Sequence, residues 1–258
     1  MNIEVSTLII SFILLIGLNV PIAVSIGIST ALTLMIGAGF SPAMSTVAQQ
    51  IATGFDSFTL IAIPLFILSG NIMAKGGLAK RLINFAKTIV GGLPGGLALV
   101  NIVSAMLFGA ISGSAIASAA AIGSFMHPRM VKEGYDAGYS AAVNVTASTT
   151  GLIIPPSNVL IVYSLASGGV SIGALFVAGY LPGILLGMGF MVVSSILAYQ
   201  QGIKGSDSVS IIEILKRFYD AILSLTMIFI IIGGIIFGVF TATEAAAVAV
   251  VYALIITM

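Results

Sequence analysis

The sequence predicts an all-α integral membrane protein with several spanning helices, one re-entrant hairpin and one broken helix. Of its 258 residues, 59% are hydrophobic and only 7% are charged, and the mean hydropathy is +1.22. Charged residues are absent between Glu4 and Asp56, Lys87 and Arg129, Asp136 and Lys204, and Asp220 and Glu244. Each of these stretches can hold at least one helix of roughly 20 residues, the length that a bilayer core requires. Soluble domains do not need so much apolar surface, so the lipid bilayer is the expected surrounding.

Apolar runs and the breaks between them give the expected spanning helices. They lie at 3–18, 21–37, 58–74, 137–165 with an interruption, 176–199, 221–240 and 241–258. The first run is a retained helix, because no Lys or Arg precedes it as in a cleaved signal peptide. Pro64 lies inside the third run and should kink that helix. Segments 75–90 and 210–219 alternate charged and apolar residues as amphipathic interfacial helices do; for 210–219 a plain loop helix is an equal alternative.

Basic residues give the expected orientation, because Lys and Arg in short loops favour the cytoplasmic side. They form three groups: Lys75, Lys80, Arg81 and Lys87; Arg129 and Lys132; and Lys204, Lys216 and Arg217. With the N-terminus outside, three crossings bring the first group inside. A re-entrant hairpin over 95–128, turning at Ser112-Gly113-Ser114, then brings the second group to the same side. An ordinary single crossing would place one of these two groups outside.

Two clusters of small polar residues interrupt the apolar chain between residues 109 and 158. The first is GAISGS at 109–114, and the second is TASTTG at 146–151, which leads into PPSN at 155–158. Backbone without helical hydrogen bonds is tolerated at membrane depth only inside protein or beside a cavity. Such interruptions line ion and solute sites in membrane proteins, although small residues also serve simply to pack helices closely.

Composition also excludes several kinds of site. A net charge of +1 gives no basic surface for nucleic acid, and without cysteine there is no disulfide, thiolate metal site or cysteine nucleophile. His127 is the single histidine and is expected to be an interfacial side chain. Glu244 follows Thr241 with capping-box spacing, so we expect a helix cap there. Asp56 is expected to cap or flank the start of the helix that follows it.

Several motifs, in this order along the chain, resemble the large membrane subunit of tripartite ATP-independent periplasmic (TRAP) transporters. They are DSFTLIAIPLF at 56–66, GNIMAKGGL at 70–78, GG at 95–96, SGSAIASAAAIG at 112–123, PRMVKEGY at 128–135, IIPPSN at 153–158 and AGYLPG at 178–183. The resemblance implies a sodium-coupled permease of the elevator type, multi-pass in a bacterial inner membrane with a periplasmic N-terminus. It also implies an organic-acid substrate, such as a C4-dicarboxylate, sialic acid or a related sugar acid. The implied partners are a periplasmic substrate-binding protein and a small membrane subunit.

The family resemblance also implies an inverted-repeat architecture, of which only the first repeat looks complete, because large subunits of this family are considerably longer. Residues 1–94 then hold the first scaffold helices and an arm helix. Residues 95–203 form the transport region, with the hairpin at 95–128, the broken helix at 137–167 and a further helix at 176–200. Residues 204–258 hold a second arm helix and the start of the second scaffold.

The implied sodium ion is expected between the hairpin tip and the helix break, because freed carbonyl oxygens can replace its hydration shell. The expected sodium ligands are Ser112, Gly113, Ser114, Gly151, Ile154 and Pro155. The helix N-termini after Ser114 and Pro156 carry partial positive charge, which suits a substrate carboxylate. The expected substrate contacts are Ser114, Thr149, Thr150, Ser157 and Asn158.

Two other classes of function are alternatives. One is a membrane structural or assembly subunit whose polar clusters only pack helices. The other is an intramembrane hydrolase with Ser114 as nucleophile and His127 as base, although nothing in the sequence specifies a carboxylate that would orient this base. We therefore expect no enzymatic activity.

Overall fold

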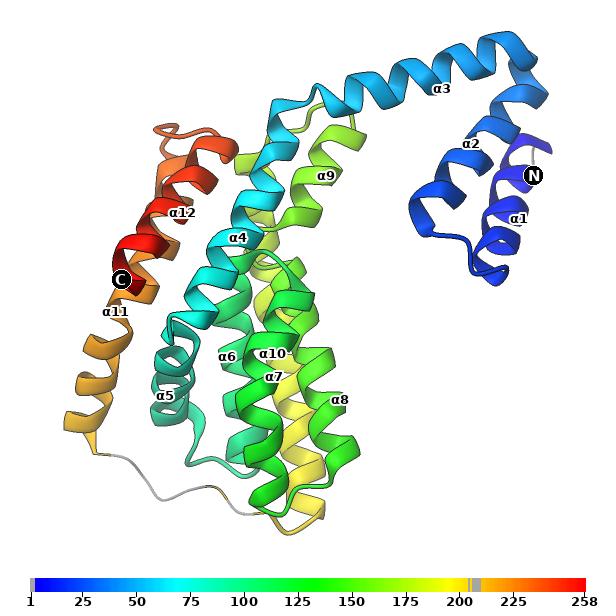
Figure 1. The fold of residues 1–258 in the computed structure, drawn as a ribbon. Coiled ribbons are helices and arrows are strands. Elements are labelled where there is room, and N and C mark those ends of the chain that lie inside the picture. The colour runs from blue at the N-terminus through cyan, green and yellow to red at the C-terminus, as the bar shows by residue number, and fades with distance from the viewer. Residues whose placement is uncertain (1–2, 204, 206–209) are drawn as a thin grey trace. The chain divides into compact units, whose positions relative to one another are not determined.

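The computed structural model describes residues 3–203, 205 and 210–258, and every regular element in these ranges is a helix. The chain forms two compact units, one that ends at Ser57 and one that begins at Phe58. Figure 1 follows both units from the N-terminus to the C-terminus. The expected first region, 1–94, therefore extends over parts of both units.

The first unit contains helices α1 (Ile3–Gly17), α2 (Ile22–Ala38) and α3 (Phe40–Phe55). The first two confirm the helices expected at 3–18 and 21–37. Helix α3 was not predicted, because its Ser, Thr and Gln residues interrupt the apolar run. Asp56 is the C-cap of α3, where its N–H donates to Ala52 O. Asp56 thus flanks the helical stretch that begins at Phe58, as predicted, but the helix end that it caps is that of α3.

The second unit opens with a short 3₁₀ turn, η1 (Phe58–Ile61), followed by α4 (Ala62–Lys75) and α5 (Leu78–Val90). Pro64 lies in the first turn of α4, where its missing N–H has no helical partner to lose. Pro64 also lies inside the helical stretch Phe58–Lys75, just after its change from 3₁₀ to α geometry, and the predicted kink stays a prediction. Helix α5 confirms the amphipathic segment, since one face is buried through Leu78, Ala79, Leu82, Ile83 and Ala86.

A hairpin of two helices forms the centre of this unit (Figure 1). Helix α6 (Gly96–Ser112) is buried along most of its length, and α7 (Ala115–Lys132) returns beside it. The Ser118 hydroxyl donates to Ala105 O at 3.2 Å and ties the two together. Helix α8 (Ala137–Ser148) packs on both, and the Asn144 side-chain amide donates to Ala119 O at 3.0 Å.

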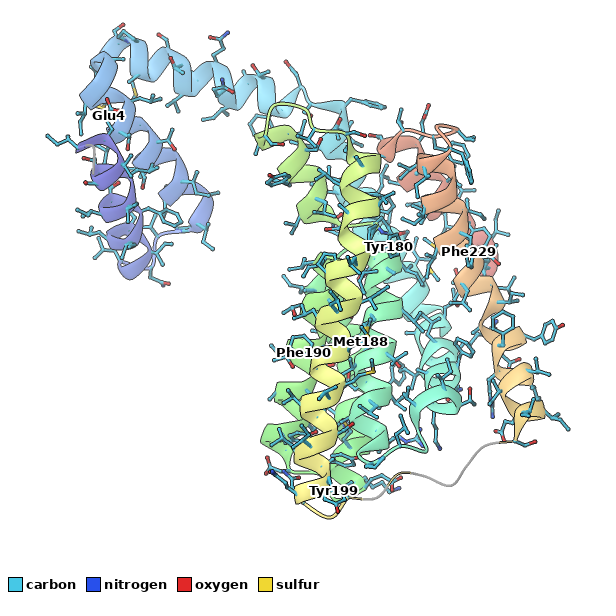
Figure 2. All side chains as sticks on the ribbon, turned by 180° about the vertical axis from the view of Figure 1, so that it is seen from behind. Glu4, Tyr180, Met188, Phe190, Tyr199 and Phe229 are labelled. Atoms are coloured by element: carbon cyan, nitrogen blue, oxygen red, sulfur yellow. The ribbon has the colours of Figure 1, made fainter. Side chains whose placement is uncertain are left out.

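The predicted break follows α8 and divides the expected helix 137–165. A 3₁₀ turn, η2 (Thr149–Leu152), and a non-helical stretch separate α8 from α9 (Asn158–Ala166). Helix α10 (Ile172–Gln200) then runs along α6 and α8, and the Tyr139 hydroxyl donates to Ser194 O at 3.0 Å. Tyr180, Met188, Phe190 and Tyr199 follow one another along α10 in Figure 2.

The last two helices are α11 (Ile211–Ile236) and α12 (Ala242–Thr257). A separate helix at 210–219 was predicted, but it continues directly into the following apolar run. No Gly or Pro occurs between 210 and 232, so nothing in this part of the sequence ends the helix. The Thr241 and Glu244 capping box is confirmed at the start of α12.

Three helical stretches in the described residues are long and apolar enough to cross a bilayer. They are Phe58–Lys75, Ile172–Gln200 and Ile211–Ile236. The helices Ile3–Gly17, Ile22–Ala38, Gly96–Ser112 and Ala242–Thr257 are apolar but shorter. At about 1.5 Å per residue, the 17 residues of α6 span roughly 25 Å, less than a typical hydrocarbon core of about 30 Å.

Candidate ion-binding site

The turn between α6 and α7 depends on Gly113. Its φ of 61° lies in the left-handed region, which glycine adopts without steric cost, and its N–H donates to Gly109 O at 2.8 Å. Ser114 is the N-cap of α7, and its hydroxyl accepts from Ala117 N at 3.3 Å. The chain therefore reverses at the Ser112-Gly113-Ser114 position that the sequence predicts.

The break between α8 and α9 depends on Pro155 and Pro156, which have no backbone N–H to continue a helix. Within the described part of the chain, neither Ile154 O nor Pro155 O accepts a backbone hydrogen bond. Ser157 then caps α9, because its hydroxyl accepts from Leu160 N at 3.2 Å. The break thus contains the free carbonyl oxygens that the prediction required.

The hairpin tip and the break lie against each other. Asn158 N donates to Gly113 O at 3.2 Å, and a Cβ built on Gly113 would lie only 2.8 Å from Pro156 O. One turn away, a Cβ on Gly109 would lie 2.3 Å from the Gly151 Cα. These glycines allow two backbones to approach more closely than any side chain would permit.

Helix α4 contacts the same tip from another side. A Cβ on Gly70 would lie 2.6 Å from the Ser112 Cβ, so α4 packs directly on the last residue of α6. Ser112 is fully buried, and its hydroxyl lies 3.4 Å from both the N and the O of Ser114. No local pattern in the sequence predicts this contact with α4.

The Asn158 side chain adds an oxygen without a partner at this junction. Its Oδ1 is buried and has no hydrogen-bond partner, and it lies 3.3 Å from the Cβ position of Gly113. A buried polar atom normally has a partner, because leaving it without one costs about 1–3 kcal/mol. An uncharged amide oxygen and nearby carbonyls are hard donors of the kind that sodium prefers. The residues present therefore fit a small hard cation.

Other hydroxyls predicted to contact substrate already have acceptors. Thr149 Oγ1 donates to Thr146 O at 2.7 Å, and Thr150 Oγ1 donates to Ala147 O at 2.6 Å. The Ser157 hydroxyl donates to Leu152 O. Thr149 is exposed, whereas Thr150 and Ser157 are fully buried. Asn158 was predicted as a substrate contact, and its buried, unpartnered Oδ1 also makes it a candidate ion ligand.

The alternative of a serine hydrolase does not fit the geometry. His127 lies in the last third of α7, and its Nδ1 lies 3.0 Å from Ser140 Oγ on α8. Ser114 lies at the opposite end of α7, where its hydroxyl is the N-cap. His127 and Ser114 therefore cannot form a nucleophile and base pair.

An apolar cavity of about 770 Å³ is lined by residues of α6, α10 and α11. Tyr180 and Phe229, labelled in Figure 2, line it together with Ala110 and Ile154, which adjoin the hairpin tip and the break. Its lining offers few polar groups, so it does not suit a charged acid.

Comparison with known proteins decides the family. Residues 9–258 match the model of the "Tripartite ATP-independent periplasmic transporter, DctM component". The chain belongs to this TRAP transporter family. A C4-dicarboxylate TRAP transporter large permease protein of Vibrio cholerae serotype O1 is 43% identical over 249 residues, covering 95% of this chain and 54% of the relative. A sialic acid large permease protein of the same organism is 40% identical, covering 83% and 50% respectively.

A further relative, an uncharacterized protein of Salmonella typhimurium (strain LT2), is 52% identical over 244 residues, covering 95% of this chain and 56% of the relative. The chain thus spans about half the length of these three relatives. Family membership and the apolar helices establish a membrane-embedded protein that belongs to a transporter family, not an enzyme family.

Proposed function

We propose that this chain carries the first half of the transport site of a sodium-coupled TRAP large permease. The unpartnered Asn158 Oδ1 beside Gly113 is the observation that carries this proposal. This atom supplies one uncharged oxygen where the hairpin tip meets the helix break. A sodium ion bound there would give the oxygen the partner that it lacks. The other proposed sodium ligands come from the hairpin tip and from the break. They are Ser112, Gly113, Ser114, Gly151, Ile154 and Pro155.

The substrate is an organic acid, and its carboxylate is recognised near the N-termini of α7 and α9. Both helices start at this junction, after the caps Ser114 and Ser157, and their partial positive charge favours an anion. The family supports this class of substrate, as do two relatives that are named for C4-dicarboxylate and sialic acid transport. Sodium at the tip would add positive charge close to the same carboxylate.

The movement is of the elevator type, with α6–α9 carrying the site and α5 bracing it. Helix α5 packs on both α6 and α11, so it links the hairpin to a long apolar helix. A periplasmic binding protein delivers the acid, and a small membrane subunit supports the permease, in a bacterial inner membrane with the N-terminus periplasmic. The hairpin is re-entrant and does not cross the bilayer.

Uptake tests this function. In vesicles that contain the permease with its binding protein, an inward sodium gradient should drive uptake of a labelled C4-dicarboxylate or sialic acid, and an equal potassium gradient should not. Ser112→Ala and Asn158→Ala should weaken uptake and its sodium dependence while the protein remains in the membrane. If both variants keep the wild-type sodium dependence, the polar clusters only pack helices, which is the second candidate function.

A further inference from the structure

A second polar site lies at the opposite end of the hairpin, where the amino end of α6 and the carboxyl end of α7 meet α5. A cavity of about 120 Å³ opens there, lined by Lys87, Gly91, Leu97, Arg129, Glu133 and Tyr135, with Ile203 as an apolar wall. The ion site at the tip uses none of these residues. Arg129, Glu133 and Tyr135 belong to the PRMVKEGY motif, for which the proposed transport site gives no role.

Two cations face this cavity from different helices. Lys87 is in the last turn of α5, and Arg129 is in the last turn of α7. Both are partly buried, and among the described residues no carboxylate oxygen lies within 4.0 Å of either side-chain nitrogen. Glu133 lines the same cavity but is exposed, so among the described lining residues two cations face one carboxylate. These described residues therefore give the cavity an excess of positive charge.

Tyr135 supplies a buried hydroxyl to the same cavity. Only 5% of the residue is exposed, and its ring stacks on Tyr139 with 6.1 Å between the ring centroids. Tyr139 is itself fixed by its hydrogen bond to Ser194 O. Burial raises the pKa of the Tyr135 phenol above its usual value, partly offset by the Leu97 backbone, which lowers it. Tyr135 is thus a protonated O–H donor near neutral pH, held in one place.

We infer that this cavity binds a phosphate group, with Lys87 and Arg129 neutralising its charge and the Tyr135 hydroxyl donating to one of its oxygens. Arginine and lysine both bind phosphate, and basic pockets between membrane helices bind anionic lipid headgroups. The phosphate would connect the end of α5 to the end of α7. It would thereby hold the bracing helix against the base of the hairpin.

A phosphate can come from a lipid or from solution, and the two sources are separated by the probe. Native mass spectrometry of the purified full chain would measure retention of phosphatidylglycerol and of phosphatidylcholine, and thermal unfolding would measure stabilisation by potassium phosphate against potassium chloride. We expect preferential retention of phosphatidylglycerol, the anionic lipid. Stabilisation by inorganic phosphate alone would assign the same cavity to a free phosphate.

Two double variants are compared. The cavity pair combines Lys87→Gln with Arg129→Gln, and the control pair combines Lys80→Gln with Lys132→Gln. Both pairs remove two charges from α5 and α7, but Lys80 and Lys132 are exposed and lie outside the cavity lining. The cavity pair should reduce phosphate-group binding about tenfold and the control pair much less. Equal losses in both pairs, or no binding of either probe by the wild type, would overturn the inference.

Glu133→Gln provides a test that does not depend on a destabilising change. Removing the carboxylate of Glu133, which among the described residues is alone in lining the cavity, should strengthen binding of the same probe, because it removes repulsion of the phosphate. Weaker or unchanged binding in this variant would contradict the site. The sodium response of the hairpin tip should be unchanged in it, so failure here is distinct from failure of the proposed transport site.

Discussion

The backbone N–H of Asn158 donates to the carbonyl oxygen of Gly113 at 3.2 Å, and this bond joins the start of α9 to the turn of the hairpin. The two residues are far apart in sequence, and each follows an interruption in an apolar helix. Their contact leaves the Asn158 Oδ1 inside the junction without a partner. The geometry of this pair underlies the proposed ion site.

Gly113→Ala should destabilise the chain by about 1–2 kcal/mol from its left-handed backbone alone, and by more because the new Cβ meets Pro156 O. Thermal unfolding of the purified protein measures the loss. Gly134→Ala is the matched control, since Gly134 has a φ of 89° but open space around its Cβ position. Equal losses in the two variants would mean that the hairpin tip does not pack on the break as described.

Ser104→Ala and Ser118→Ala should have opposite effects on stability. Both serines are fully buried and lie in the hairpin, but the Ser104 hydroxyl has no partner and the Ser118 hydroxyl donates to Ala105 O. Removing an unpaired hydroxyl should be neutral or stabilise by up to about 1 kcal/mol, and removing a bonded one should cost about 1 kcal/mol. Denaturation of both variants under one condition gives the comparison. A loss for Ser104→Ala as large as for Ser118→Ala would show that Ser104 has a partner in the membrane.

The two ends of the hairpin should lie on the same side of the membrane. The chain has no native cysteine, so Lys80→Cys on α5 and Lys132→Cys at the end of α7 each give one exposed thiol. An impermeant thiol reagent applied to right-side-out and inverted vesicles should label both from the cytoplasmic side. Labelling from opposite sides would mean that one helix of the hairpin crosses the bilayer.

Much of this fold could be predicted because its signals are local in sequence. Apolar runs identified most of the helices, an amphipathic pattern identified α5, and the Thr241 and Glu244 spacing identified a capping box that the structure contains. The turn at Gly113 and the break at Pro155 follow from residues that cannot continue a helix. These are properties of short segments, so no knowledge of the tertiary structure was needed.

The predictions failed where a helix contains polar residues, where a helix was divided although no residue ends it, and where the feature depends on tertiary packing. Helix α3 was missed because its polar residues interrupt the apolar run, and 210–219 was separated from the rest of α11 although no residue there ends the helix. The contact of Gly70 with Ser112 joins segments distant in sequence, so local patterns cannot predict it. The same holds for the Asn158 oxygen, whose lack of a partner is visible only once the break and the tip are together.

Sodium-dependent thermal unfolding of the purified chain tests the proposed ion site most directly. Sodium at about 100 times its dissociation constant should stabilise the wild type by about 2.7 kcal/mol, and potassium at equal ionic strength should not. Asn158→Ala should lose most of this stabilisation. Asn144→Ala is the control, because Asn144 also has a buried, unpartnered Oδ1 but packs against Gly123 and Ala119 on α7, and it should keep the sodium response. A full sodium response in Asn158→Ala, or none in the wild type, would contradict a sodium site between Gly113 and Asn158.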